Sequence, residues 1–202
     1  MRILMIGAGG VIGRAVADDL AQRHEVLRAG RSSGELRVDM EDFASVQQLF
    51  ARAGALDAVV TTAGSLHLGP LAQTMPEQFM HGLRSKLMGQ MHVVLAGHSQ
   101  LREGGCFTLT SGIVSAASQA QIRGGSNAST VNSALEGFVQ AAATELPRGL
   151  RINVISPAMV DASVETYGPF FPGFEPVPLS RVVQAYWRSI EGVQTGQRFA
   201  IE

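Results

Sequence analysis

The sequence has 202 residues (21.4 kDa), which is enough for one substantial hydrophobic core and too few for two comfortable domains. A hydrophobic fraction of 46% with only 16% charged residues excludes a disordered chain, and 16 basic against 17 acidic side chains give no electrostatic reason to expect a nucleic-acid partner. The single cysteine, Cys106, excludes an internal disulfide, and the five scattered histidines predict no metal site.

The N-terminal half alternates short apolar runs with amphipathic stretches. Ile3 to Ile6 is a continuous apolar run, which is typical of a strand buried on both faces. It is much shorter than a signal-peptide core, and no stretch reaches a membrane-spanning length, so we expect a cytoplasmic protein without a membrane partner. Apolar residues at three- and four-residue spacing then predict a helix from Val11 to Leu20. The next predicted elements are strands at Val26 to Leu27 and Leu36 to Val38, a helix at Phe43 to Phe50, a strand at Ala58 to Thr61 and a long helix from about Pro76 to His98.

The C-terminal half continues the alternation of strands and helices. The predicted elements are a strand at Phe107 to Thr110, a helix at Ala128 to Leu146, a strand at Ile152 to Ile155, a helix at Leu179 to Gly192 and a strand at Arg198 to Ile201. The proline-rich segment 156–178 is longer than most connections and is predicted to act as a lid. We therefore predict an α/β fold with a doubly wound parallel sheet in a single domain, residues 1–202.

A glycine-rich turn, Gly7-Ala8-Gly9-Gly10-Val11-Ile12-Gly13, joins the first strand to the first helix. The phosphates of a dinucleotide need backbone that approaches closely and the positive end of a helix, and both are expected at this place in a Rossmann-type sheet. The alternative is a tight strand-to-helix connection with no ligand. Cofactor binding is the leading interpretation.

The end of the second strand carries a basic residue where NAD-binding proteins usually carry an acidic one. The segment reads Ala29-Gly30-Arg31-Ser32-Ser33. Arg31 offers a bidentate partner for a 2′-phosphate, with Ser32 as a supporting donor, which favours NADP(H) over NAD. The alternative is a solvated surface arginine.

Together these residues resemble the short-chain dehydrogenase/reductase family over essentially the whole chain. Gly7, Gly10 and Gly13 resemble its phosphate-loop glycines, with Val11 where many members have another glycine. Thr61-Thr62-Ala63-Gly64 is similar to its Asn-Asn-Ala-Gly segment, and Arg151 to Pro157 resembles its sixth strand. Family members are usually somewhat longer. The resemblance implies that Asp39 contacts adenine, and the residues expected to bind the cofactor are Gly7, Gly9, Gly10, Val11, Ile12, Gly13, Arg31, Ser32, Asp39, Met40, Ala63, Gly64 and Pro157.

The resemblance ends at the residues that carry the family's chemistry. Ser111 resembles the catalytic serine, but the family's tyrosine and lysine, four residues apart on the following helix, align with Ala128 and Asn132. In the family the tyrosine moves the substrate proton, and the lysine lowers its pKa and holds the nicotinamide ribose; an alanine does neither. The chain's two tyrosines, Tyr167 and Tyr186, lie outside the motif.

A second departure lies on the long central helix. Counting back from Gly89 places Lys86 where the family has an asparagine. Asn132 stands where the family has its lysine, so the two residue types have exchanged positions on two neighbouring helices. We hypothesise that Lys86 brings its ammonium group toward the ribose and the reacting oxygen. The alternative is that Lys86 is an ordinary exposed helix residue.

Other groups are candidates for the missing proton donor. His67 lies just past the Ala63-Gly64 turn, and imidazole is a common acid–base group in enzymes; Tyr167 lies in the predicted lid. Ser111 can orient a carbonyl but needs a partner to act as an acid. Each of these residues has a plainer alternative, as a loop residue or a strand-end cap.

The predicted lid and the small residues of the following helix bear on substrate and partners. The lid carries Met159, Tyr167, Phe170, Phe171 and Phe174, which predict a hydrophobic or aromatic small-molecule substrate unless they fill the core or a subunit contact. Ala162 stands where the family often has a threonine that binds the nicotinamide carboxamide. The resemblance also implies a homo-oligomer, and small helix residues would allow close packing: Ala128, Ser129, Ser133, Ala134, Gly137 and Ala141.

Two functions follow from these observations. One is an NADP(H)-dependent oxidoreductase of a small carbonyl compound, with Lys86, Ser111 or His67 handling the proton and Asn132 as a further residue of the catalytic site. The other is a catalytically deficient NADP-binding sensor or regulatory protein, which the missing tyrosine and lysine favour.

Overall fold

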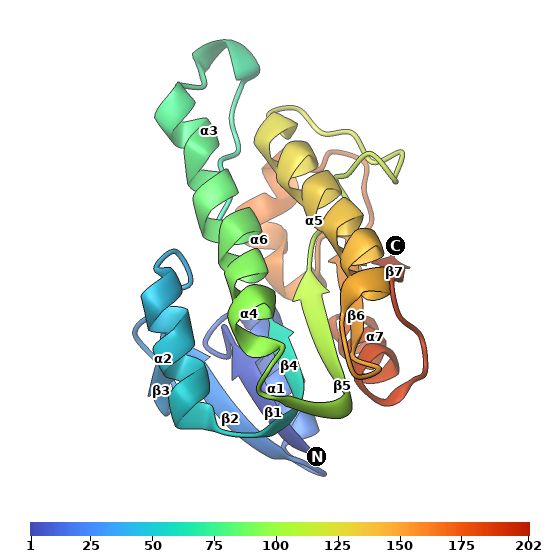
Figure 1. The fold of residues 1–202 in the computed structure, drawn as a ribbon. Coiled ribbons are helices and arrows are strands. Elements are labelled where there is room, and N and C mark those ends of the chain that lie inside the picture. Colours follow the sequence, from blue (N-terminus) through green and yellow to red (C-terminus); the bar gives the residue numbers. More distant parts are fainter.

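A seven-stranded, fully parallel sheet with strand order β3-β2-β1-β4-β5-β6-β7 forms the centre of the computed structural model, which describes all residues 1–202 (Figure 1). The strands are β1 (Arg2–Ile6), β2 (Glu25–Gly30), β3 (Leu36–Arg37), β4 (Leu56–Thr61), β5 (Leu101–Thr110), β6 (Arg151–Pro157) and β7 (Arg198–Ile201). The order runs outward from β1 in one direction and from β4 in the other. The predicted single-domain, doubly wound α/β fold is therefore confirmed.

Helices cover both faces of the sheet. On one face lie α2 (Phe43–Ala53), α4 (Gly89–Gly97) and α5 (Ser126–Glu145), and on the other lie α1 (Val11–Leu20) and α7 (Leu179–Glu191) (Figure 1). Successive residues of β1 alternate between the two cores, with Leu4 and Ile6 in one and Ile3 and Met5 in the other. Because both faces are buried, the strand reads as an unbroken apolar run rather than an alternating one.

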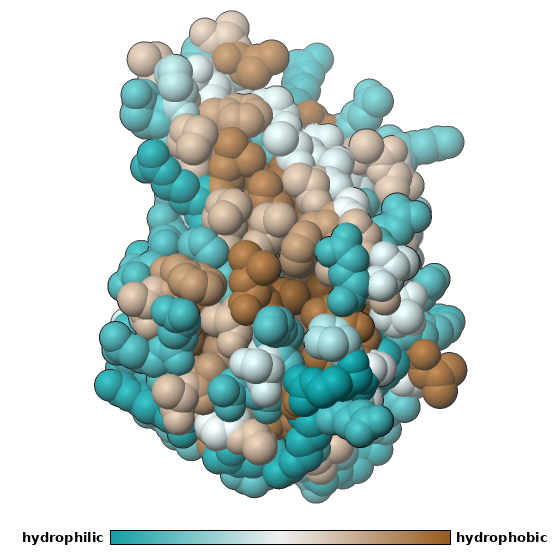
Figure 2. Space-filling model, in the orientation of Figure 1, coloured by the Kyte–Doolittle hydropathy of each residue, from teal (hydrophilic) through white to brown (hydrophobic).

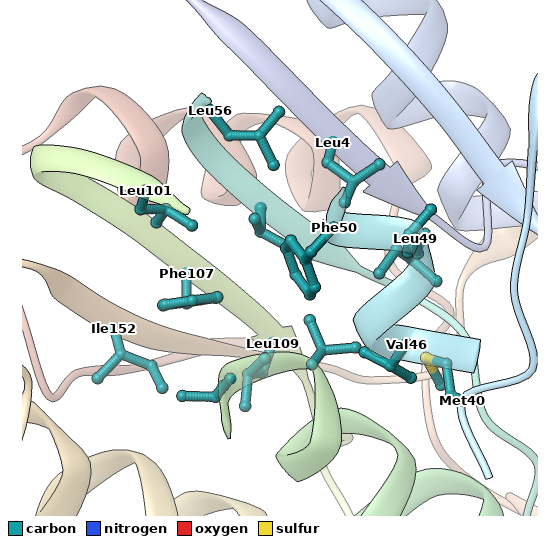
Figure 3. Close-up of a cluster of buried hydrophobic side chains, with 14 of the residues drawn as sticks. Leu4, Met40, Val46, Leu49, Phe50, Leu56, Leu101, Phe107, Leu109 and Ile152 are labelled. Atoms are coloured by element: carbon teal, nitrogen blue, oxygen red, sulfur yellow. The ribbon is translucent and has the colours of Figure 1, made fainter. Parts of the chain in front are cut away.

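The larger core is built around Phe50 of α2, whose ring is surrounded by side chains of the sheet, including Leu4, Leu56 and Phe107 (Figure 3). The neighbouring helix approaches so closely that a Cβ added to Gly97 of α4 would overlap the Phe50 ring. This glycine is thus required by packing rather than by backbone conformation. The contact holds α2 and α4 together near Leu56, the first residue of β4.

The long helix expected from Pro76 to His98 is continuous but not uniform. It consists of α3 (Pro76–Gly82), the π-helical segment η2 (Leu83–Met88) and α4. A π-helical turn is rare and frequently lies at a functional site. Apolar periodicity did not reveal it, because one wide turn shifts the pattern by a single residue. Two polar residues of η2, Ser85 and Lys86, are buried.

The segment 156–178 has more structure than a plain loop. It contains three short helices, η3 (Asp161–Ser163), α6 (Val164–Tyr167) and η4 (Gly168–Phe170). One other short helix, η1 (Leu71–Gln73), lies outside this segment, in the connection between β4 and α3. A parallel bridge between Val160 and Val177 closes its ends, with the Val177 amide donating to the Met159 carbonyl at 2.9 Å. The segment therefore folds back on itself over the sheet edge. None of the helices has both the length and the apolar character needed to cross a membrane.

Candidate functional site

Two adjoining cavities lie at the carboxyl edge of the sheet, around the point where the strand order reverses between β1 and β4. This is where ligands bind in open α/β sheets. The outer cavity, of about 310 Å³, lies against the glycine-rich turn and the ends of β2 and β3, and the inner cavity, of about 380 Å³, lies under the lid. Gly64, in the turn after β4, lines both. The two cavities therefore adjoin at Gly64.

The glycines of the first turn serve two different purposes. Gly7 has φ +91°, and a Cβ added there would lie 2.7 Å from the Ala63 amide nitrogen; at Gly13 an added Cβ would overlap the Gly7 carbonyl. The fold itself requires these two glycines. At Gly10, by contrast, an added Cβ would meet nothing closer than 3.7 Å, and Gly9 and Gly10 are exposed at the cavity. The bare backbone before α1, whose first amides have no side-chain cap, fits the close approach of a pyrophosphate.

The residues expected around the adenosine lie together at the outer cavity. Arg31 and Ser32 are exposed there, and neither side chain has a hydrogen-bond or ion-pair partner in the protein. Asp39 is held in place, because its Oδ1 accepts the Glu41 amide at 3.0 Å. Of the other residues expected to bind the cofactor, Gly7, Met40, Ala63 and Gly64 line this cavity, Ile12 and Pro157 line the inner one, and Val11 and Gly13 line neither. Ser33, Glu41 and Ser85 also line the outer cavity and were not anticipated.

Lys86 is the charged residue of the inner cavity, and it is the only lysine in the chain. Its side chain is buried, with 8% of the residue exposed. The Nζ donates to the Ser111 carbonyl at 2.6 Å and to Asn132 Oδ1 at 3.0 Å. Burial lowers the pKa of Lys86 to about 8, partly offset by the negative charge of Glu136. The structure therefore brings the two exchanged positions, Lys86 and Asn132, into direct contact.

Asn132 is fixed by bonds on both sides of its amide. While Oδ1 accepts from Lys86, Nδ2 donates to the Val114 carbonyl at 2.9 Å. Gly112 permits this arrangement, since an added Cβ would come within 3.1 Å of Asn132 Nδ2. The amide thus holds the ammonium group in one orientation.

The Ser111 hydroxyl is engaged beneath the cavity. It donates to Glu136 Oε1 at 3.0 Å, and the same carboxylate oxygen accepts from Ser156 Oγ at 3.2 Å and from Arg198 Nε at 3.0 Å. Sequence reasoning did not single out Glu136 as a site residue. The available signal was its spacing, because Glu136 lies one helical turn after Asn132 on α5 and so shares its face.

The remaining candidate proton donors are dispersed. Tyr167 of α6 lines the inner cavity and is 45% exposed. His67 lines neither cavity; its Nε2 lies 3.3 Å from Thr74 Oγ1 in the loop before α3. Tyr186 is fully buried on the opposite face, where its hydroxyl lies 2.6 Å from Thr110 Oγ1 and burial raises its pKa.

The lid contributes part of its apolar set to the inner cavity. Met159, Tyr167 and Phe171 line it, while Phe174 packs edge-on against Phe171 and lies outside. Ser163 lines the cavity and its neighbour Ala162 does not. Ala128, at the position aligned with the missing tyrosine, also lines the cavity. Apolar side chains therefore make up most of the wall around Lys86.

Comparison with known proteins shows the family to which the chain belongs. The family model described as enoyl-(acyl carrier protein) reductase matches residues 7–181. The protein lin1944 from Listeria innocua has a similar crystal structure, with 40% sequence identity, 100% coverage of both chains and a TM-score of 0.96. A small-chain dehydrogenase solved in complex with NADPH is 25% identical, with 100% of this chain and 96% of that chain covered and a TM-score of 0.86.

Two curated relatives are named as a reductase and a reductase-like protein. Versicolorin reductase stcU from Emericella nidulans is 30% identical over 131 residues, which span 54% of this chain and only 50% of that protein. The hydroxynaphthalene reductase-like protein Arp2 from Metarhizium brunneum is 25% identical over 195 residues, 82% of this chain and 72% of that protein. With the parallel sheet and the glycine-rich dinucleotide cleft, the family match establishes that the chain belongs to the short-chain dehydrogenase/reductase family of nicotinamide-dependent oxidoreductases.

Proposed function

We propose that this protein is an NADP(H)-dependent reductase of a small carbonyl compound, in which Lys86 replaces the family's tyrosine as the proton donor. The observation that carries the proposal is the position of Lys86 Nζ, which is held at the inner cavity by the Ser111 carbonyl and Asn132 Oδ1. The aligned tyrosine position is Ala128, which has no proton to give.

The outer cavity favours NADP(H) over NAD. Arg31 and Ser32 lie beside the cavity with all their side-chain donors available, and a guanidinium group is suited to bidentate binding of a phosphate. The cradle before α1 takes the pyrophosphate, and Asp39 lies where the family places its adenine contact. When bound, NADPH supplies the hydride to the carbonyl carbon.

Lys86 is suited to protonate the carbonyl oxygen. An ammonium group has three N–H donors, and two are occupied by Ser111 and Asn132, so one remains for a ligand in the cavity. With a pKa of about 8, the group is mostly protonated at neutral pH and yet a stronger acid than a solvent-exposed lysine. It gives its proton to the oxygen as negative charge develops there, and the resulting amine is reprotonated from solvent.

The inner cavity favours a substrate with an apolar, ring-sized body. Its lining includes Leu66, Ile113, Met159 and Phe171 around the single ammonium group. The name of one relative, the hydroxynaphthalene reductase-like protein, refers to a fused aromatic compound, which is the kind of body that this lining would accommodate.

A second candidate function is a catalytically deficient NADP-binding sensor. Two observations favour it: Ala128 occupies the tyrosine position, and the Ser111 hydroxyl donates to Glu136 beneath the cavity. In this case the outer cavity alone would be functional.

We also infer that the protein is a homo-oligomer. Ala134, Gly137 and Ala141 form an exposed stripe of small residues on α5, and Leu95 of the adjacent α4 is 56% exposed. Figure 2 shows apolar residues gathered on the face that these helices present. Two copies of such a face can pack closely around a two-fold axis.

The decisive experiment is a fluorescence titration of the protein with NADPH and NADH, followed by a panel of aldehydes, ketones and quinones. Tight NADPH binding with turnover that Lys86→Met lowers by about 100-fold would support the reductase. Equally tight binding without turnover on any compound would favour the sensor. Absence of binding by either cofactor would overturn both.

A further inference from the structure

Lys86 is a buried cation without a bonded anion. Both of its hydrogen-bond acceptors, the Ser111 carbonyl and the Asn132 amide, are neutral, and Lys86 forms no ion pair. Glu136 acts on Lys86 through space, since no bond joins the two; its Oε1 accepts from Ser111 Oγ, Ser156 Oγ and Arg198 Nε, and its buried Oε2 has no hydrogen-bond partner. Buried lysines are rarely left in this state, because removing an ammonium group from water is costly unless an anion compensates.

The surroundings of Lys86 leave that compensation to a ligand. No aspartate, glutamate or arginine lines the inner cavity, so Lys86 is its only formal charge. The apolar wall around the cavity weakens screening by solvent, which strengthens the attraction of the ammonium group for a negative atom. The small side chain of Ala128 also leaves space in the wall beside Asn132.

We infer that the inner cavity selects compounds that present an anionic oxygen on an apolar ring, in particular the ionised form of a phenol or of a cyclic enol. This inference rests on the proposed function, of which it names the substrate class. The anionic oxygen accepts the remaining N–H of Lys86, and its charge is delocalised over the conjugated ring. Transfer of that proton from Nζ to the oxygen leaves a neutral amine and a neutral enol or phenol. The keto tautomer of this compound accepts hydride at its carbonyl carbon, and Lys86, reprotonated from solvent, supplies the proton that the resulting alkoxide needs.

The single lysine allows a direct measurement. In protein labelled with ¹⁵N at the lysine side chain, Lys86 gives the only lysine resonance, so its pKa is read without assignment. The probes are 4-nitrophenol, which is ionised near neutral pH, and its uncharged methyl ether, 4-nitroanisole. Because an anion stabilises the ammonium form, we expect 4-nitrophenolate to raise the pKa of Lys86 by about one unit, which corresponds to about tenfold tighter binding to the protonated site. The ether should leave that pKa unchanged.

Binding measurements complete the test and need no turnover. At neutral pH the phenolate should bind about tenfold tighter than the ether, and this preference should disappear as pH rises through the Lys86 pKa, although the probe remains ionised. Lys86→Met should abolish the preference. Arg52→Met, which removes one positive charge from the exposed side of α2, should keep it. Equal binding of the two probes, or a preference that survives in Lys86→Met or at high pH, would overturn the inference.

Failure of the proposed function would look different. The probes are titrated both with and without saturating NADP⁺. If the phenolate preference holds but NADPH supports no turnover, the anion site stands and the reductase does not. If turnover is observed but the pKa of Lys86 does not respond to the phenolate, the reductase stands and the anion site does not.

Discussion

Lys86 Nζ and Asn132 Oδ1 lie 3.0 Å apart across the contact between η2 and α5, each occupying the position at which the family resemblance places the other residue type. The exchange keeps one ammonium group and one amide in the site but reverses the helices from which they come. As a result the cation reaches the cavity from the π-helical segment, opposite Ala128.

Replacement of Lys86 should separate chemistry from cofactor binding. We expect Lys86→Met to lower kcat for carbonyl reduction by about 100-fold, the lower end of the usual contribution of a general acid. The affinity for NADPH should change little, because most of the residues expected to bind the cofactor line the outer cavity, which does not include Lys86. Steady-state kinetics and a fluorescence titration measure the two effects. Full activity in Lys86→Met would remove Lys86 from the reaction.

Reversing the exchange provides a test of the pair. Asn132→Lys alone places a second ammonium group beside that of Lys86. The repulsion between the two positive charges should reduce both stability and activity. In the double variant Lys86→Asn/Asn132→Lys the pair is restored with the helices swapped, so we expect partial recovery relative to either single variant. A double-mutant cycle on Tm and kcat quantifies the coupling. Strict additivity would contradict a functional pair.

The reaction should depend on the protonation of Lys86. Burial lowers the pKa of Lys86 to about 8, so the proton-donating form, and with it the rate of reduction, should fall as pH rises through about 8. The negative charge of Glu136 raises the pKa of Lys86, so Glu136→Gln should move this fall to lower pH. The pH profile of kcat measures the shift. A profile that stays in place while Tm drops would assign Glu136 a structural role only.

Cofactor preference should depend on Arg31. Arg31→Ala removes the exposed guanidinium group at the outer cavity, and we expect about tenfold weaker NADPH binding with NADH binding little changed. Arg37→Ala is the matched control, since Arg37 lies nearby on β3 but does not line the cavity. Equal losses for both cofactors, or a loss in the control, would argue against recognition of the 2′-phosphate.

Packing between α2 and α4 should be sensitive to one methyl group. A Cβ at Gly97 would overlap the ring of Phe50, so Gly97→Ala should lower the free energy of unfolding by about 1–3 kcal/mol, despite the higher helix propensity of alanine. Urea denaturation measures the change. The second substitution Phe50→Leu, which shortens the obstructing side chain, should recover part of the loss.

The oligomer should depend on the small residues of α5. No atom lies within 4 Å of a Cβ added to Gly137, so a side chain there is tolerated by the monomer. Gly137→Glu would introduce a charge into the expected contact, and we expect it to shift the protein toward monomer in light scattering coupled to gel filtration. An unmodified protein that is already monomeric, or a variant with an unchanged mass, would rule out this interface.

The order of strands and helices and the dinucleotide cleft could be read from the sequence, because these features depend on local signals. Continuous apolar runs mark strands buried on both faces, and the glycines at Gly7 and Gly13 mark a turn in which backbone segments meet closely. The exchange of residue types at positions 86 and 132 was likewise visible from the sequence, by comparison with the family pattern. The hydrogen bond between the two side chains could not be predicted in the same way, since contact between residues 46 positions apart depends on the packing of two helices.

Only the tertiary structure decided which polar groups share the site. The π-helical turn that directs Lys86 inward involves a shift of one residue, which hydrophobic periodicity does not resolve. Glu136 became part of the site because α5 packs beside the ends of β5 and β6, where Ser111 and Ser156 lie. His67, a candidate by its position in the sequence, lies outside the cavity. Sequence specifies the elements through local propensity and periodicity, whereas burial, charge and proton affinity at the site arise from contacts between elements that are distant in the chain.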